Sequence, residues 1–366
     1  MKQHNNIPQL RFPEFDGEWE EKKFGDLSEK IKSGKDKNVA SGRFPLYGSM
    51  GVIGKAEKPT YVGQFILVAR VGANAGKIRF VEGDFGVTDN TLIIENTQEI
   101  DVIFGFFLLT VANLNRYVFG SGQPLVTGSM LKKLSVSIPT LPEQQKIAQF
   151  LTSVDKRIQL LTCKKEQLEF YKKGAMQKIF NREIRFKNEN GKEFPEWEEK
   201  KLGEVCKIRK GQQLNKIELE NEGAYPAQNG GVVPSGFTDQ WNCNEDTITI
   251  SEGGNSCGYV NYMKTKFWCG GHCYTILNLK KEINDIYLYQ FLKIKQAAIM
   301  RLRVGSGLPN IQKVDLLKFE LLLPSYSEQQ KIAQFLTALD KKIEHTTGEI
   351  EKMKEWKRGL LQKMFV

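Results

Sequence analysis

The sequence has few of the residues that enzymes use for catalysis. Only three histidines are present, His4, His272 and His345, and none has a nucleophile or a carboxylate at catalytic spacing. The segment Gly72–Ile78 departs from a phosphate-binding loop, because it has one residue too few between its glycines and an isoleucine where magnesium chemistry needs serine or threonine. The Asp-Pro-Pro-Tyr and Asn-Pro-Pro-Phe tetrapeptides of amino-methyltransferases are absent. We therefore expect a binding protein that is not itself an enzyme.

Long apolar segments are also absent. The longest, Val102–Ala112, is far short of the ~20 residues that a membrane helix requires, and it predicts a buried helix instead. The N-terminal segment Met1–Pro8 is polar and lacks the apolar stretch of a secretory signal. We expect a cytoplasmic protein that does not contact a membrane.

The six cysteines are unevenly distributed. Cys243, Cys257, Cys269 and Cys273 lie in one region with His272, and only Cys269 and Cys273 are closely spaced. Zinc needs ligands that converge tetrahedrally, and the corresponding region of the first half of the chain has no cysteine. A structural metal in only one half of a repeat is unexpected. We therefore expect free thiols and no metal site, with zinc as the alternative.

Positive charge is in excess. The 366 residues carry a net charge of +10 and have a pI near 9.1. This balance favours a polyanionic partner, although basicity alone is a weak signal. The length suffices for two or three domains, each with its own core.

The most informative feature that is present is an internal duplication. Glu143–Ile158 returns as Glu328–Ile343 with three differences, and Glu18–Gly25 returns as Glu196–Gly203. Between these blocks the two copies keep glycines, asparagines and apolar runs but differ elsewhere. This pattern indicates a shared scaffold with divergent binding surfaces. A duplicated protein normally forms a pseudo-two-fold object, and duplex DNA with two half-sites is a natural ligand for one.

The repeated blocks begin two long segments with a heptad pattern. From Pro142 to Phe180 the only glycine is Gly174, and apolar residues alternate at spacings of four and three. The second copy repeats the pattern, so we predict two long helices that pack along an apolar seam. The predicted seam residues are Ile147, Leu151, Val154, Ile158, Leu161, Leu168, Ile332, Leu336, Leu339, Ile343, Ile350 and Met353. Polar residues that interrupt this seam, often as register devices, are Lys165, Lys172, Thr346 and Lys357.

With a globular domain between them, the second helix has to return along the first. We therefore predict an antiparallel coiled-coil pair that separates two globular domains. The expected segments are residues 1–141 and 183–323 for the domains, and residues 142–182 and 324–366 for the helices. Each domain alternates strand-like runs with turns and has a helix near its end, at Val102–Tyr117 or Ile286–Arg301, which indicates a mixed α+β fold. The strand-like runs are 64–70, 76–82, 91–95, 246–251, 258–262 and 274–279.

Loops between these strands are the candidates for ligand contact, because loops on a rigid scaffold usually carry recognition. We align Arg70–Lys77 with Ser251–Gly258, and Tyr47–Met50 with Gln228–Gly231. Arginine and lysine favour guanine or phosphate, whereas serine, glutamate and asparagine offer other pairings, so the two loop sets are suited to different sequences. The alternative for each residue is a plain structural turn. The candidate DNA contacts are Tyr47, Ser49, Arg70, Asn74, Lys77, Arg116, Ser121, Gln123, Gln228, Asn229, Ser251, Asn255, Arg301, Arg303 and Ser306.

Two variable domains that alternate with two near-identical helices form a specific pattern. Together with the Trp-Glu-Glu-Lys-Lys blocks at Trp19 and Trp197 and the Glu-Gln-Gln-Lys-Ile-Ala helix starts at Glu143 and Glu328, it resembles the DNA-specificity subunit of type I restriction-modification enzymes. The resemblance covers nearly the whole chain. It implies that each variable domain is a target-recognition domain for one half of a bipartite, asymmetric double-stranded DNA site. It also implies that the helices separate the domains and dock modification subunits.

By this resemblance the chain is a non-catalytic subunit without a cofactor of its own. Adenine-N6 methylation with S-adenosylmethionine would belong to two modification subunits, and ATP- and Mg-dependent translocation and cleavage to restriction subunits. Two alternatives are a self-contained DNA-modifying enzyme and a coiled-coil adaptor that binds no nucleic acid. The absent catalytic motifs count against the first, and the basic charge and divergent loops against the second.

Overall fold

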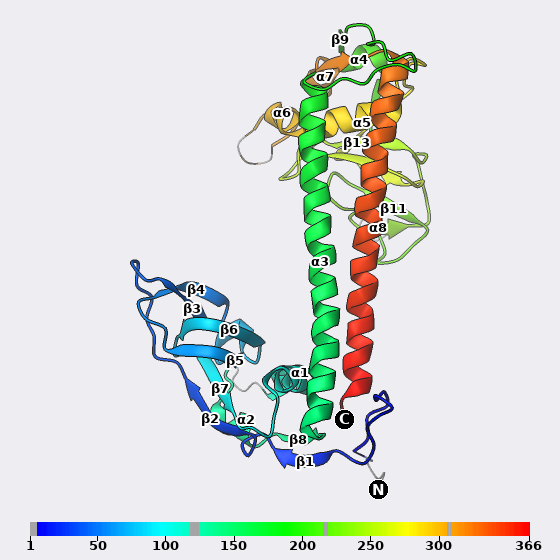
Figure 1. Ribbon diagram of the computed structural model, residues 1–366. Helices are drawn as coiled ribbons and strands as arrows, with labels where there is room; N and C mark the ends of the chain where they lie inside the picture. Colours follow the sequence, from blue (N-terminus) through cyan, green and yellow to red (C-terminus); the bar gives the residue numbers. More distant parts are fainter. Residues whose placement is uncertain (1–5, 118–123, 215–218, 306, 308) are drawn as a thin grey trace. The chain divides into compact units, whose positions relative to one another are not determined.

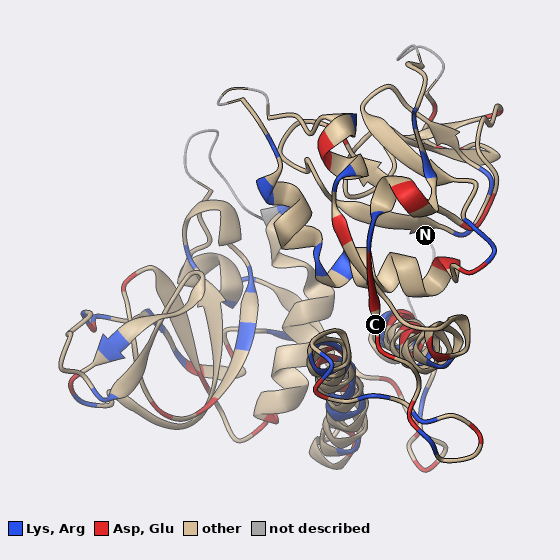
Figure 2. Cartoon of the chain, turned by 90° about the horizontal axis from the view of Figure 1, so that it is seen from above, with Lys and Arg blue, Asp and Glu red and all other residues tan. Residues whose placement is uncertain are grey.

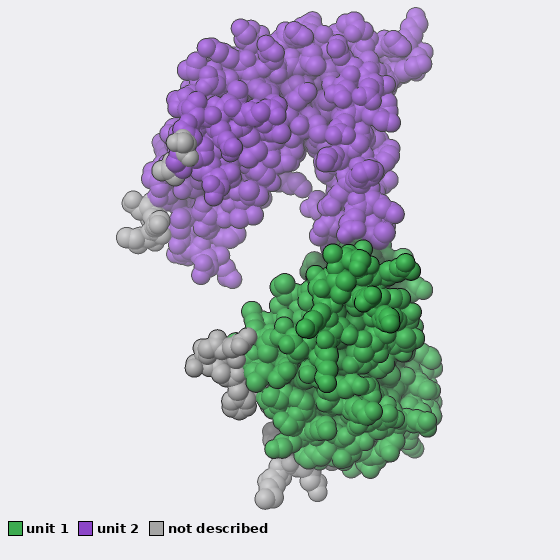
Figure 3. All heavy atoms as spheres, turned by 90° about the vertical axis from the view of Figure 1, so that its left-hand side faces the viewer, with its two compact units in different colours: residues 1–162, 348–366 green, residues 163–347 purple. Residues whose placement is uncertain are grey.

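The computed structural model in Figure 1 describes residues 6–117, 124–214, 219–305, 307 and 309–366. The chain divides into two compact units, coloured separately in Figure 3. Unit 1 consists of Met1–Thr162 and Gly348–Val366, and unit 2 of Cys163–Thr347. This division cuts each long helix, so that each unit contains one globular domain and segments of both helices. The predicted division into four consecutive segments groups the same residues differently, and its boundaries stay a prediction.

The two long helices extend over the segments with the heptad pattern. They are α3 (Leu141–Phe180) and α8 (Tyr326–Met364). Within each unit the segments of α3 and α8 lie side by side and run antiparallel (Figure 1). All predicted seam residues are buried or half-buried; the half-buried ones are Ile158, Leu168, Ile343 and Met353.

Two of the polar interruptions form ion pairs between the helix segments. Lys357 pairs with Asp155 at 2.6 Å in unit 1, and Lys172 pairs with Asp340 at 2.6 Å in unit 2. These residues occupy the same positions in the two copies of the repeat. An ion pair at a seam favours one register, because sliding the helices would separate the charges.

The main sheets of the two units have the same strand order. Unit 1 has the order β2-β7-β5-β6-β3-β4, and unit 2 has β10-β16-β13-β14. Pairs β2·β7, β7·β5 and β5·β6 are antiparallel, as are β10·β16, β16·β13 and β13·β14. The strands of unit 1 are β2 (Ser28–Ser33), β3 (Phe44–Gly48), β4 (Gly51–Ala56), β5 (Tyr61–Ala69), β6 (Ile78–Val87) and β7 (Thr91–Asn96). Those of unit 2 are β10 (Lys207–Lys210), β13 (Thr247–Ser251), β14 (Val260–Met263) and β16 (Cys273–Leu277).

A second small sheet in unit 2 has the order β12-β11-β15. It consists of β11 (Tyr225–Gln228), β12 (Phe237–Thr238) and β15 (Trp268–Cys269). Strand β11 runs parallel to β15, as β3 runs parallel to β6 in unit 1. The end of β11 therefore corresponds to the end of β3, which confirms the alignment of Gln228 with Tyr47.

The helices that follow the sheets are shorter than the sequence predicts. The helix expected at 102–117 ends as α1 (Val102–Ala112), because Asn113 adopts a left-handed conformation with φ 48°, and a 3-10 helix η2 (Leu114–Tyr117) follows. The helix expected at 286–301 is divided at Lys295 into α5 (Asp285–Ile294) and α6 (Gln296–Arg301). The remaining short helices are η1 (Gly72–Asn74), α2 (Gly128–Lys132), α4 (Leu202–Val205) and α7 (Lys313–Leu317).

Each globular domain is closed by a two-stranded sheet next to the start of a long helix. β1 (Glu20–Lys23) pairs with β8 (Ser135–Ile138), and β9 (Glu198–Lys201) pairs with β17 (Glu320–Leu323). β1 and β9 have the same Glu-Glu-Lys-Lys sequence, and their side chains are largely exposed. This confirms that these repeated acidic residues belong to solvated strands.

The repeated glutamate at the start of each helix fastens the domain to that helix. Glu143 is 1% exposed, pairs with Arg11 at 2.7 Å and accepts a hydrogen bond from the Trp19 indole at 3.4 Å. Unit 2 repeats this arrangement: Glu328 is fully buried, pairs with Arg185 at 3.0 Å and accepts from Trp197 at 3.1 Å. A buried carboxylate is tolerated only when it is paired and hydrogen-bonded, so these partners hold the chain entrance in place.

The end of each long helix completes the core of one unit. In unit 2, Phe180 of α3 packs against Tyr287 and Phe291 of α5. In unit 1, Phe365 just after α8 stacks on Phe104 of α1 with ring centroids 5.4 Å apart. Unit 1 therefore takes part of its core from the C-terminal end of the chain.

Candidate nucleic-acid interface

The candidate interface of each unit is the turn between the two central antiparallel strands. In unit 1 this turn joins β5 to β6, and in unit 2 it joins β13 to β14. Each backbone hydrogen bond in the first turn has a counterpart in the second. The matched bonds are 69–77 with 251–259, 76–69 with 258–251, 75–72 with 257–254, 77–74 with 259–256, 72–124 with 254–309, 126–70 with 311–252 and 70–90 with 252–272.

These bonds correct the alignment predicted from the sequence. Arg70 corresponds to Glu252 and not to Ser251, so Arg70–Lys77 matches residues 252–259. The glycines agree with the new register, because Gly72 and Gly254 have φ of 77° and 75°, and Gly76 and Gly258 have φ of 85° and 86°. Left-handed backbone is the conformation for which glycine is the default residue. A search for glycines in both required positions would have found this register.

The second glycine of each turn also lies against the segment that follows the domain helix. A Cβ at Gly76 would be 2.8 Å from the Asn115 side chain, and one at Gly258 would be 2.8 Å from the backbone Cα of Met300. Each turn is therefore packed onto the helix end. This contact brings Arg116 next to the turn in unit 1 and Arg301 next to it in unit 2, as the sequence predicted.

In unit 1 the candidate residues are mostly accessible. Lys77 and Arg116 are exposed, and Arg70 is half-buried, with a weak 3.4 Å hydrogen bond from its guanidinium to the Asp89 carbonyl. Half-buried residues of the same set are Tyr47, Ser49 and Asn74. Sequence reasoning missed Arg79 of β6, whose guanidinium donates to the carbonyls of Ser49 at 3.3 Å and Met50 at 2.8 Å. Arg79 thus holds the β3–β4 hairpin beside the candidate surface.

In unit 2 the predicted residues divide into exposed and structural ones. Asn255, Arg301 and Arg303 are exposed. Gln228 and Ser251 are buried, and their side chains donate to the carbonyls of Gly231 and Gly230 inside the loop cluster. Their position is that of residues that shape the surface. The predicted residues Ser121, Gln123 and Ser306 lie outside the described part of the chain.

Asn229 is half-buried and holds a neighbouring loop. Its side-chain oxygen accepts a hydrogen bond from the backbone N–H of His272 at 3.4 Å. The His272 carbonyl in turn accepts from the N–H of Glu252 at 2.9 Å. The loops at 228–231, 251–258 and 270–273 are thereby joined into one surface.

Sequence reasoning also missed a polar cluster at the centre of this surface. Glu252 is 4% exposed, and one of its oxygens, Oε1, accepts from Lys210 Nζ at 2.6 Å and from the Tyr274 hydroxyl at 3.0 Å. Burial, and then the nearby Glu252 carboxylate, raise the pKa of Tyr274, so its hydroxyl stays a donor. The other oxygen, Oε2, has no hydrogen-bond partner among the described residues, and His272 Nδ1 lies 3.9 Å from it.

The cysteine region of unit 2 is a packed cluster of thiols. Cys243, Cys269 and Cys273 are buried with Phe267, and all six cysteines are free. A hydrogen bond from the Cys269 thiol, assisted by the Arg209 guanidinium 3.3 Å away, lowers the pKa of Cys243 to about 7. The same hydrogen bonds and burial raise the pKa of Cys269. Among the described residues no group of three or more histidine, cysteine or acidic side chains is arranged to hold a metal ion.

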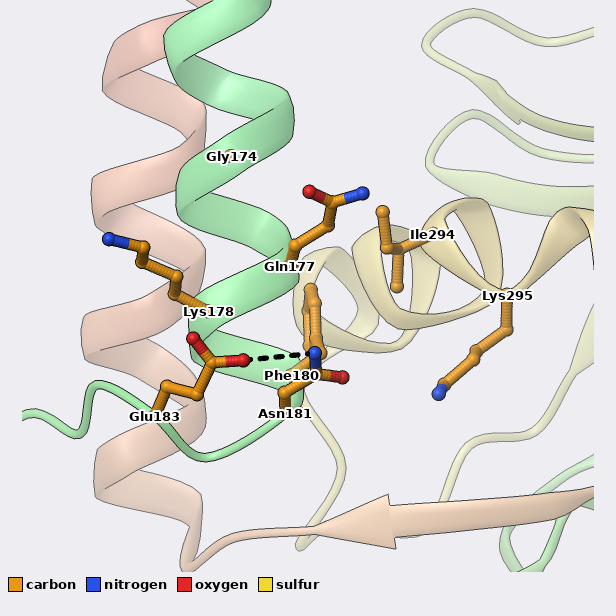
Figure 4. A pocket seen from close by; sticks show the side chains of 8 residues that line it. All are labelled: Gly174, Gln177, Lys178, Phe180, Asn181, Glu183, Ile294 and Lys295. Atoms are coloured by element: carbon orange, nitrogen blue, oxygen red, sulfur yellow. Dashed lines mark hydrogen bonds between the residues drawn. The ribbon is translucent and has the colours of Figure 1, made fainter.

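The deepest hollows of the described surface are shallow and lack converging reactive groups. One near the end of α3, in unit 2, has a volume of about 430 Å³ and is lined by residues such as Gln177, Phe180 and Lys295 (Figure 4). Its one hydrogen bond among the lining side chains joins Asn181 to Glu183 at 3.2 Å. Lysines and arginines lie on both units among acidic residues (Figure 2). No helix in the described ranges is both long and apolar enough to span a membrane.

Comparison with known proteins gives a consistent result. The model of the type I restriction modification DNA specificity domain matches this chain twice, over residues 16–170 and 195–355. A putative type I specificity subunit of Mycoplasma pneumoniae is 34% identical over 171 residues, which are 46% of this chain and 45% of that protein. A putative type I restriction enzyme MjaX specificity subunit of Methanocaldococcus jannaschii is 27% identical over 312 residues, which are 78% of this chain and 73% of that protein.

A solved structure shares the fold over nearly its whole length. The type I restriction-modification system S subunit from M. genitalium superposes with a TM-score of 0.73 at 21% sequence identity, covering 98% of this chain and 99% of that one. The alignment with the Mycoplasma pneumoniae relative spans less than half of that protein's length. Because the two matches to the family model lie in the two halves of the duplication and together cover most of the sequence, the chain belongs to the type I restriction-modification DNA specificity family.

Proposed function

We propose that this chain is the DNA-sequence-specificity subunit of a type I restriction-modification complex. Each globular domain reads one half of a bipartite, asymmetric site in double-stranded DNA. The chain itself carries out no chemistry. It acts in the cytoplasm, where its target DNA is found.

One observation supports two separate reading surfaces more than any other. The turns at 70–77 and 252–259 have the same backbone hydrogen bonds but different side chains, with Arg70 at the position of Glu252 and Lys77 at that of Tyr259. A constant backbone presents its side chains at the same place, so changing those side chains changes which base edges or phosphates are complementary. Two domains of one fold are thereby suited to two different half-sites.

The partners follow from the family. Two modification subunits dock on the long helices and supply S-adenosylmethionine-dependent methylation of adenine N6. Restriction subunits supply ATP- and Mg-dependent translocation and cleavage. The exposed aromatic side chains Phe170 and Tyr171 on α3 and Trp356 on α8 give the helices apolar surface for such docking. Tyr171 and Trp356 occupy equivalent positions of the repeat, which suits two copies of one partner.

A domain exchange tests this function. Residues 190–323 are replaced by the corresponding domain of another family member, and the variant is assembled with the modification subunits of this system. Mapping of methylated adenines should show one changed half-site and one unchanged half-site. A change in both half-sites, or in neither, would contradict independent reading.

The chain without partners is the control. It should transfer no methyl groups from S-adenosylmethionine to DNA, whereas the assembled complex should. Methylation by a preparation free of modification subunit would favour the alternative, a self-contained DNA-modifying enzyme. An assembled complex that neither binds nor methylates DNA would favour an adaptor role.

A further inference from the structure

The buried carboxylate of Glu252 has one oxygen without a hydrogen-bond partner. Its Oε1 binds Lys210 and Tyr274, whereas Oε2 is enclosed and accepts no hydrogen bond from the described residues. A buried acceptor that lacks a donor is unfavourable by about 1–3 kcal/mol, and more when it is charged. The nearest donor group is the His272 ring, whose Nδ1 lies 3.9 Å away.

His272 is held so that its ring is available on both sides. Its backbone is fixed by the hydrogen bonds to Asn229 and Glu252, while its side chain is 65% exposed. A protonated imidazole has two N–H donors. One of them suits the unpartnered Glu252 oxygen, which leaves the other directed away from the carboxylate toward solvent.

The corresponding place in unit 1 has a permanent cation. The matched hydrogen bonds put Arg70 at the position of Glu252 and Asn90 at that of His272. The β-sheet registers put Ser33 at the position of Lys210, because Ser33 pairs with Leu92 as Lys210 pairs with Tyr274. Unit 1 therefore presents an arginine where unit 2 presents a lysine and a histidine held by a carboxylate.

We propose that His272 and Lys210 form a contact for a DNA backbone phosphate, in which His272 takes up a proton when DNA binds and Glu252 is the positioning residue. The inference rests on the proposed function and adds one phosphate contact to the second half-site. With a neutral His272, the charges of Lys210 and Glu252 cancel, and the site attracts an anion weakly. A phosphate near the outer imidazole nitrogen favours the charged ring, and the charged ring gives Glu252 Oε2 its missing donor.

The ionisable groups that face His272 are few. Glu252 comes from the end of β13, Lys210 from β10 and Tyr274 from β16. Arg303 is near enough to the adjacent Cys257 to influence that thiol electrostatically, and it adds positive charge on the far side of the turn. In this surroundings only histidine changes charge between about pH 5 and pH 8, apart from perturbed thiols.

The test uses the chain assembled with its modification subunits and a fluorescent duplex that carries the target site. Binding is measured by anisotropy at about pH 6 and pH 8, and at several salt concentrations. The unmodified complex should bind roughly three- to tenfold more tightly at the lower pH, because one linked proton changes affinity by at most tenfold per pH unit. His272→Gln should abolish most of this difference, and Glu252→Gln should reduce it.

Two further variants separate the contact from general effects. Lys210→Gln should lower the slope of log affinity against log salt by about one, as expected for one lost phosphate contact. The matched controls are Lys207→Gln, an exposed lysine on the same strand, and His345→Gln, an exposed histidine on α8. Both controls should leave the pH difference unchanged. Equal pH dependence in His272→Gln and the unmodified complex would overturn this inference alone, whereas failure of the unmodified complex to bind its target would overturn the proposed function.

Discussion

At the residue scale, the repeated Glu143 and Glu328 are structural attachment points. The sequence identified both as the start of a repeated helix, but it gave no sign of their partners, because Arg11 and Arg185 precede them by more than a hundred residues. The sequential neighbours Gln144 and Gln329 act in the same way. Their side chains cap backbone groups of the domain helices at Asp101 and Asn284.

Replacing Glu143 by alanine should destabilise unit 1 selectively. The change leaves the Arg11 guanidinium without its carboxylate in a largely buried position, and breaking such a pair costs about 3 kcal/mol. Calorimetry or hydrogen exchange should show earlier unfolding of residues in the core of unit 1, with the core of unit 2 little affected. Glu328→Ala should produce the opposite distribution. Glu166→Ala, at an exposed position of α3, is the control and should change neither.

At the element scale, the long helices were predictable because their pattern is strong and local. Heptad spacing and the absence of proline within the segments are enough to predict α3 and α8 to within a residue or two at the start. The strand order was not predictable, since pairing depends on contacts distant in sequence. The turn alignment was one residue wrong, because matching Asn74 to Asn255 was attractive in sequence while the left-handed glycines required a different register.

Candidate site residues show the same limit. Exposed basic positions such as Lys77, Arg116 and Arg303 were recognisable from charge and from their place in loops. The burial of Gln228 and Ser251 was not, because a polar residue at a strand end serves equally well inside a loop cluster. Glu252 and His272 escaped notice since their meaning depends on a contact between two loops.

Pairing of the helix segments in unit 2 should depend on the charges of Lys172 and Asp340. Lys172→Asp places two carboxylates together and should lower the stability of this unit by about 1 kcal/mol, because the pair is only partly shielded from solvent. Asp340→Lys should have a similar effect. The double exchange should restore most of the loss, as measured by denaturant unfolding in a double-mutant cycle. If the two single effects simply add in the double variant, the pair does not contribute to register. The exposed pair of Lys165 and Glu169 within α3 is the control.

At the scale of the whole molecule, duplication divides labour between constant and variable parts. The strand order, the turn backbone and the glutamate attachment recur in both units, whereas the side chains at the turn differ. Selection on one reading surface therefore leaves the other and the helices unchanged. The same constancy predicts that the helices, and not the domains, set the distance between half-sites.

Insertion of one heptad into both α3 and α8 tests that role of the helices. Seven residues preserve the apolar seam and lengthen each helix by about 10 Å, at 1.5 Å per residue. With stacked bases about 3.4 Å apart, the preferred spacer between half-sites should grow by about three base pairs. Insertions of one or two residues should instead rotate the apolar stripe out of the interface and impair assembly. The measurement is methylation, by the assembled complex, of targets whose spacers have graded lengths. Because both domains keep their own turns, the half-site sequences should stay the same while the optimal spacer shifts; an unchanged optimum in an assembled heptad variant would mean that the helices do not set the spacing.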